Sequence, residues 1–181
     1  MKPASERETE YRQFFSNAYP DALRFAQRRT APERAEDAVA DAMLVAWRRF
    51  DQAPSDLGER RAWLFGIVRF TILNGSRSEA RQSALAVRIV DTSFADGEDH
   101  SGDTALRLDL ARAWNRLSVA EQEVLSLAIF EMLTAPQAAR VLRISSVAFR
   151  ARLMRARRVL QSHLAPETPP TSRLHVQETQ S

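Results

Sequence analysis

Two helix-start signals follow each other closely in the last third of the chain, and they restrict this region to helices joined by tight turns. Ser118 and Glu121 match a capping box, in which the serine oxygen and the glutamate side chain satisfy free N–H groups at a helix start. Thr134 and Gln137 repeat this spacing around a proline that needs no N–H in the first turn. The expected helices run over 121–132 and 134–142.

The helix expected next carries a dense run of arginines. Ser145 follows a tight turn and caps a helix that reaches about Leu160, so a short helix, a turn and a longer helix form a helix-turn-helix motif. No acidic residue stands within this last helix, and its like charges repel one another unless a polyanion such as duplex DNA neutralises them. In this motif the first residues meet base edges and the later arginines contact phosphates. The expected DNA contacts are Ser145, Ser146, Val147, Arg150, Arg152, Arg155, Arg157 and Arg158.

Composition favours an all-α fold without catalytic chemistry. The chain has 5 glycines and 2 tyrosines among 181 residues, and it is rich in the helix formers Ala, Leu, Arg and Glu. No cysteine is present, which excludes disulfides, thiol nucleophiles and Cys-ligated zinc. His100, His163 and His175 are scattered and form no ligand or base cluster in the sequence. We therefore expect no enzyme, no metal site and no cofactor.

Charge and proline patterns divide the chain into blocks. An acidic segment with glycines separates two helical blocks, and a proline-rich tail without helical periodicity follows the second. We expect two small helical domains joined by a flexible linker. The expected boundaries are 1–81 for the N-terminal domain, 82–104 for the linker, 105–164 for the C-terminal domain and 165–181 for a disordered tail. With neither a signal peptide nor a membrane span in the sequence, we expect a cytoplasmic protein.

Apolar spacing predicts the helices of the N-terminal block. Pro20 is expected to break the first amphipathic stretch, so that a new helix starts there. A second helix over about 33–50 has an apolar face that includes Val39 and Met43. A third helix is expected over about 59–77.

Longer motifs in both blocks match a known bacterial family. In the C-terminal block they are Glu123-Val124-Leu125, Ala138 to Ser145, and Arg152-Leu153-Met154-Arg155-Ala156-Arg157. In the N-terminal block they are Ala35 to Arg48 and Arg61 to Arg69. The chain thereby resembles the extracytoplasmic-function sigma factors, the two-domain specificity subunits of bacterial RNA polymerase. The resemblance implies a protein that selects promoters and leaves catalysis to the polymerase.

The resemblance also implies a polymerase-binding helix, which would dock on the clamp coiled coil of the largest subunit. The residues support this role, because Asp37, Asp41, Leu44 and Arg48 form a mixed charged and apolar stripe opposite the core face. The expected polymerase contacts are Glu36, Asp37, Asp41, Leu44 and Arg48.

By the same resemblance, the loop over 51–58 and the helix after it would capture the melted strand of the −10 element, while the helix-turn-helix reads the −35 element. Unstacking a base costs about a few kcal/mol, and stacking of that base on an aromatic side chain would offset the cost. Arginine side chains would bind the phosphates along the strand. The expected contacts are Arg60, Arg61, Phe65, Arg69, Phe70, Asn74 and Arg77. Trp63 is expected in the core instead.

Several positions depart from the family pattern, among them Asn74, which replaces an Asp, and the basic run after it, which is thinned to Gly75-Ser76-Arg77-Ser78. Phe70 stands where the family usually has Asn, and Ala40 replaces a Gln on the polymerase-binding helix. Arg143 replaces the glycine of the turn in the helix-turn-helix. An arginine adopts a left-handed conformation there only at a cost, or the turn differs.

Two other functions stay open on the sequence. A sigma-mimicking module that sequesters an anti-sigma factor is one, although it would not need the arginines of the last helix. An ordinary helix-turn-helix regulator is the other, and it would leave the match over 35–48 unexplained. An anti-sigma factor is also an expected partner of a functional sigma factor.

Overall fold

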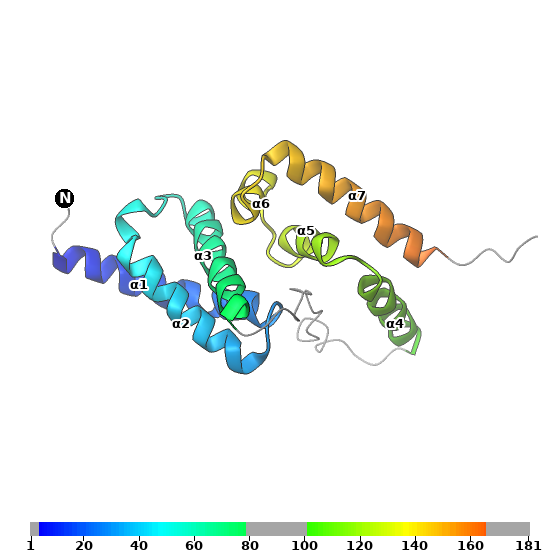
Figure 1. Cartoon of the computed structure of the whole chain (residues 1–181), viewed down its shortest axis with the longest axis horizontal. Coiled ribbons are helices and arrows are strands. Elements are labelled where there is room, and N and C mark those ends of the chain that lie inside the picture. Colours follow the sequence, from blue (N-terminus) through cyan, green and yellow to red (C-terminus); the bar gives the residue numbers. More distant parts are fainter. Residues whose placement is uncertain (1–3, 79–100, 166–181) are drawn as a thin grey trace, which may run out of the picture.

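The computed structural model describes residues 4–78 and 101–165, and every regular element in these ranges is a helix (Figure 1), which confirms the all-α prediction. The helices are α1 (Ala4–Gln27), α2 (Pro32–Arg48), the short 3-10 helix η1 (Phe50–Gln52), α3 (Leu57–Ser78), α4 (Ser101–Asn115), α5 (Val119–Ile129), α6 (Ala135–Leu142) and α7 (Ser146–Leu164). None of these helices is both long and apolar enough to cross a membrane. Most of the predicted linker and tail lie outside the described residues, and the domain boundaries stay a prediction.

The first helix differs from expectation, because α1 runs through Pro20 without a break. Proline cannot donate the hydrogen bond that a helical N–H gives to the carbonyl four residues earlier, which here belongs to Ser16. Both residues are exposed, so water can reach that carbonyl. Beyond the proline, Phe25 and Ala26 are fully buried and fix the end of α1 in the core.

The helices α1, α2 and α3 pack together and form the N-terminal half of the structure. The apolar face predicted for α2 is buried, including Val39 and Met43, while the opposite face is exposed. On α3, Leu64, Val68 and Ile72 recur at intervals of four and are buried in the same core. This packing leaves one long side of α2 in solvent.

The two predicted helix starts in the C-terminal half are present. The backbone N–H of Ser118 donates to the Glu121 carboxylate at 2.9 Å, and the Ser118 hydroxyl accepts from the Glu121 N–H, which completes the capping box. The N–H of Thr134 donates to the side-chain oxygen of Gln137 at 2.9 Å. These bonds fix where α5 and α6 begin.

The turn between α6 and α7 contains a left-handed arginine. Arg143 has φ 54° and ψ 46°, so the structure retains the turn in which the family pattern has glycine. Ser145 then caps α7, since its hydroxyl accepts from the N–H of Ala148 at 3.1 Å. The predicted helix-turn-helix is therefore formed by α6 and α7.

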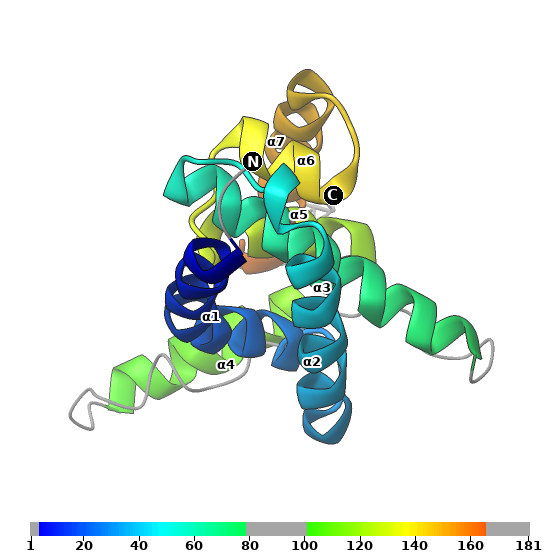
Figure 2. The same ribbon diagram turned by 90° about the vertical axis from the view of Figure 1, so that its left-hand side faces the viewer.

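The N-terminal half and the C-terminal half (α4–α7) share one apolar core. Figure 2 shows α5, α6 and α7 behind the N-terminal helices, and Val141 and Phe149 are buried in the same cluster as Phe65. The helix α6 lies along α3, where a Cβ added at Gly66 would be 3.9 Å from the Val141 Cα. A second, smaller cluster around Trp114 holds α4 against α5 and α7.

Candidate nucleic-acid interface

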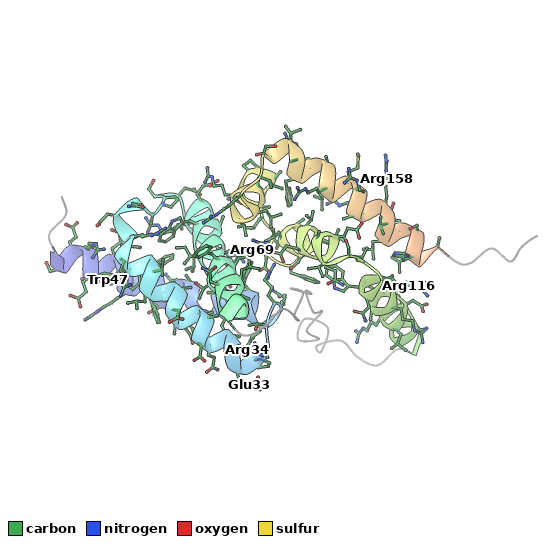
Figure 3. The ribbon with its side chains drawn as sticks, in the orientation of Figure 1. Glu33, Arg34, Trp47, Arg69, Arg116 and Arg158 are labelled. Atoms are coloured by element: carbon green, nitrogen blue, oxygen red, sulfur yellow. The ribbon has the colours of Figure 1, made fainter. Side chains whose placement is uncertain are left out.

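The helix α7 turns one face away from the rest of the molecule. Phe149 and Ala156 are buried and attach it to the C-terminal half. With 3.6 residues per turn, Val147, Met154 and Arg158 lie on the other side. Val147 is 69% and Met154 53% exposed, and Figure 3 shows Arg158 pointing outward. An apolar strip bordered by cations suits the grooves and phosphates of duplex DNA.

The five arginines predicted to contact DNA are all exposed, and none of them pairs with an acidic residue in the described parts of the chain. Arg158 lies at the centre of the outward face, and Arg155 lies about 60° to one side of it. Arg150 and Arg157 lie on one flank of the helix, and Arg152 lies on the opposite flank. A single duplex can therefore meet four of them more readily than all five.

The predicted polymerase contacts form an exposed stripe on α2. The four charged residues of this set and Leu44, which is 49% exposed, all face solvent. Asp37, Asp41, Leu44 and Arg48 are spaced by four, three and four residues, which keeps them on one side of the helix. The stripe is thus available to a partner in this arrangement.

The predicted strand contacts on α3 are in part already engaged. Phe65 is fully buried and stacks on Phe25, with ring centroids 4.5 Å apart, so neither ring face is open to a base here. Arg61 donates to the Asp21 carboxylate at 2.7 Å and to the backbone carbonyl of Glu131 at 2.6 Å. These residues therefore form part of the packing between the halves.

Further along α3, Arg69 and Phe70 also contact residues of the C-terminal half. Arg69 donates to the Glu123 carboxylate at 3.3 Å, and the Arg143 guanidinium lies 5.3 Å from the centre of the Phe70 ring. Asn74 is exposed. Arg60 is held within the N-terminal half, where it donates to the Pro54 carbonyl at 2.6 Å and pairs with Glu10 at 3.2 Å. The Arg77 side chain lies outside the described residues.

A groove of about 1170 Å³ brings two predicted surfaces together. Asp41, Leu44 and Arg48 of α2 line it, as do Phe70 and Asn74 of α3, and α6 contributes to its lining. The polymerase stripe and the end of the strand-binding face are therefore neighbours. In the described ranges, no group of three His, Asp or Glu side chains could hold a metal ion.

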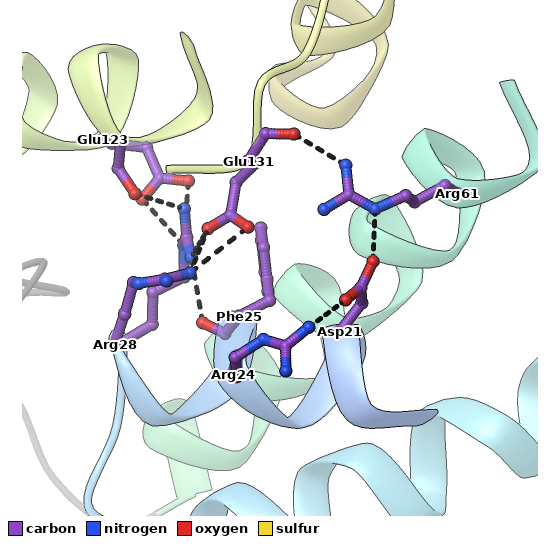
Figure 4. A network of polar contacts seen from close by, with 9 residues as sticks. Asp21, Arg24, Phe25, Arg28, Arg61, Glu123 and Glu131 are labelled. Carbon is purple, nitrogen blue, oxygen red and sulfur yellow. Dashed lines mark hydrogen bonds and ion pairs between the residues drawn. The ribbon is translucent and has the colours of Figure 1, made fainter. Parts of the chain in front are cut away.

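A buried ion cluster between the halves was not expected from the sequence. Arg29 is 4% exposed and donates to the Glu123 carboxylate at 3.1 Å and to the Glu131 carboxylate at 3.2 Å. Figure 4 labels both glutamates and Arg28. Arg29 also donates to the Phe25 carbonyl at 2.9 Å, and Arg28 reaches Glu131 at 3.3 Å. We call Arg28, Arg29, Glu123 and Glu131 the ion cluster. Its charges are paired, as buried charges require.

Known proteins resemble this chain in sequence and in fold. Residues 14–82 match the family model described as Sigma-70 region 2. The chain is 30% identical over 138 residues to the RNA polymerase sigma factor NccH of Alcaligenes xylosoxydans xylosoxydans, covering 71% of this chain and 72% of NccH.

Two solved structures have a similar fold. One is the sigma factor RpoE in complex with the anti-sigma factor NepR from Bartonella quintana, with a TM-score of 0.63, 24% identity and coverage of 87% of this chain and 98% of that one. The other is CnrH in complex with the cytosolic domain of CnrY, with a TM-score of 0.56, 20% identity and coverage of 87% and 88%. At these identities the likeness concerns the fold. The match to NccH and to region 2, together with the helix-turn-helix, shows that this chain belongs to the RNA polymerase sigma factors of the extracytoplasmic-function type.

Proposed function

We propose that this protein binds core RNA polymerase and directs it to particular promoters. In this proposal α7 reads the upstream −35 element as duplex, and the α3 side of the N-terminal half holds the melted −10 strand. The exposed stripe on α2 binds the clamp of the polymerase. The polymerase performs the phosphoryl transfer, so the sigma factor itself needs no catalytic residue.

The observation that carries the proposal is the outward face of α7. Its arginines are exposed and unpaired within the described residues, and they border Val147 and Met154. Neutralising phosphates would release counterions and relieve the repulsion among these cations. Each element alone gives a weak contact, and two linked modules bind two elements far more tightly than either module does.

An anti-sigma factor is the third proposed partner. RpoE, which has a similar fold, was solved with the anti-sigma factor NepR, and CnrH was solved with the cytosolic domain of CnrY. The groove between α2 and α3 offers such a partner access to the polymerase stripe and to Phe70 at once. A regulator bound there would compete with the polymerase.

Co-purification with core polymerase followed by transcription on genomic fragments tests the proposal. We expect a complex that starts RNA synthesis at a small set of sites, with loss of these transcripts when the exposed arginines of α7 are replaced by Ala. Polymerase binding without site-specific transcripts would contradict promoter selection. No association with polymerase would instead favour the sigma-mimicking module that binds an anti-sigma factor.

A further inference from the structure

We propose that α7 recognises the C5 methyl groups of thymines in the major groove through an apolar strip near its start, formed by Val147 and Ala151. This inference rests on the proposed function, and it names the base feature that the upstream contact reads. Ala151 is not among the DNA contacts predicted from the sequence. A cytosine methylated at C5 carries the same methyl group as thymine, which makes the idea testable one methyl group at a time.

The first argument is the place of these residues on the helix. With 3.6 residues per turn, Val147 and Ala151 are neighbours one turn apart, on the side opposite the buried Phe149. They belong to the first two turns of the second helix of the motif, and these turns meet base edges when such a helix enters the major groove. Met154 extends the strip by one more turn. The side of α7 that would face the floor of the groove is therefore apolar where bases are read.

The second argument is that this strip has no role in the packing of the fold. Val147 is 69% exposed and Ala151 is exposed as well, and neither belongs to the two apolar clusters in the described part of the chain. One exposed apolar residue is ordinary at a protein surface, whereas here three of them, with Met154, follow one another along a helix that is dense in arginine. Contact with methyl groups would remove apolar surface from water on both partners.

The third argument concerns the polar side chains at the start of α7. The Ser145 hydroxyl accepts from the Ala148 N–H at 3.1 Å, so it already serves as the cap of the helix. Ser146 is partly buried. Arg150 is exposed and lies about 60° around the helix from Val147, where its guanidinium can reach a guanine beside the strip. Polar recognition thus falls to one flank, and the centre of the reading side is left to apolar contact.

The chemistry of the major groove then selects the base. Of the four bases only thymine presents an apolar group there, its C5 methyl, while the other base edges present hydrogen-bond donors and acceptors. A valine side chain offers no hydrogen bond, so it leaves a polar base edge without a partner wherever it displaces water. The strip therefore favours thymine at the positions it covers. Burial of one methyl group corresponds to about a fourfold gain in affinity.

Removal of single methyl groups from the DNA tests the proposal. The full chain, alone and bound to core polymerase, is first used to select a preferred sequence from randomised duplexes. Each thymine of that sequence is then replaced in turn by deoxyuridine, which keeps the hydrogen-bonding groups of thymine and lacks only the C5 methyl. We expect the affinity, measured by fluorescence anisotropy, to fall about fourfold at one or two neighbouring positions.

Val147→Ala identifies the side chain that contacts the methyl group. The variant loses two methyl groups at an exposed position, which should not disturb the fold, and at the sensitive positions it should bind thymine and uracil within about twofold of each other. Val119→Ala makes the same change in the first turn of α5 and should keep the fourfold difference. Arg150→Ala should bind more weakly but also keep this difference, because Arg150 acts through hydrogen bonds.

Cytosine and 5-methylcytosine give a second readout. Replacement of a sensitive T·A pair by C·G should weaken binding, and a methyl group on C5 of that cytosine should recover about fourfold of the lost affinity. This recovery is expected in the unsubstituted protein and not in Val147→Ala. If the methyl group recovers nothing in the unsubstituted protein, α7 does not read it and the inference is overturned.

This inference and the proposed function fail in different ways. Methyl recognition is overturned, and promoter selection is left standing, if the preferred duplex contains no thymine or loses no affinity with any of its thymine methyls. The same conclusion follows if Val147→Ala keeps the full difference between thymine and uracil. If the chain binds no duplex, either alone or with core polymerase, the proposed function fails and this inference fails with it.

Discussion

Arg157→Ala and Arg152→Ala are expected to affect DNA binding differently, although each removes one exposed arginine from α7. Because the helix repeats every 3.6 residues, Arg157 lies on the same flank as Arg150, and Arg152 lies on the opposite flank. A duplex centred on the outward face meets the phosphate contacts Arg155, Arg157 and Arg158, and it leaves Arg152, which lies nearest the buried Ala156, away from its phosphates. The two variants therefore form a matched pair with the same change in charge and in helix propensity.

The size of the effect follows from the number of phosphate contacts. Three phosphate contacts, from Arg155, Arg157 and Arg158, give a slope of about −2.7 in a plot of log affinity against log salt concentration, so affinity should fall about 40-fold between about 50 and 200 mM salt. Arg157→Ala should lower the magnitude of the slope to about 1.8, and Arg152→Ala should leave it near about 2.7. Fluorescence anisotropy of the full chain on a labelled duplex at several salt concentrations measures both. Equal slopes for the two variants would refute the assignment of the flanks.

Three further changes test other parts of the molecule. Asp41→Lys should weaken association with core polymerase by at least about tenfold, because it reverses a charge on the exposed stripe. The control variant Asp109→Lys on α4 should leave this association unchanged. If both variants are recovered equally in a pull-down with polymerase, the stripe is not part of the interface. Met132→Gly should raise the free energy of unfolding in urea by about 0.5–1 kcal/mol, since relief of left-handed strain exceeds the added freedom of glycine in the unfolded chain, and a loss of stability would contradict that balance. Arg150→Ala should relax selectivity at one base pair by about 1–3 kcal/mol in a selection on randomised duplexes, and a uniform loss would show that Arg150 contacts only phosphate.

The helix-turn-helix was predicted correctly from residues that interact within a single helical turn. Each helix start depends on residues within one turn, as at Ser118 and Ser145, and the structure has both caps. The same locality explains the error at Pro20. A proline inside a helix costs one hydrogen bond, and only the fold decides whether water can reach the carbonyl left without a donor.

The contact between the halves could not be predicted in this way. Arg29 and Glu123 are 94 positions apart, and a buried arginine has the same local pattern as an exposed one. The sequence did contain a signal for Phe65, because it precedes the buried Val68 and Ile72 by three and seven residues, which places all three on one face of the helix. An arginine next to such a core face can bind the phosphates of a nucleic acid or a carboxylate from another part of the chain. Only the tertiary structure shows which of these two partners the arginine has.

The contact between Arg143 and Phe70 has a consequence for how relatives diverge. Neither residue is a proposed base or phosphate contact of α7, so exchanging the pair for Gly and Asn would leave upstream recognition intact. Phe70 is also a predicted contact of the melted strand, so the exchange changes that surface as well as the contact between the halves. Two positions far apart in the sequence can thus alter what α3 offers to a promoter strand, while the face of α7 that reads the duplex stays the same.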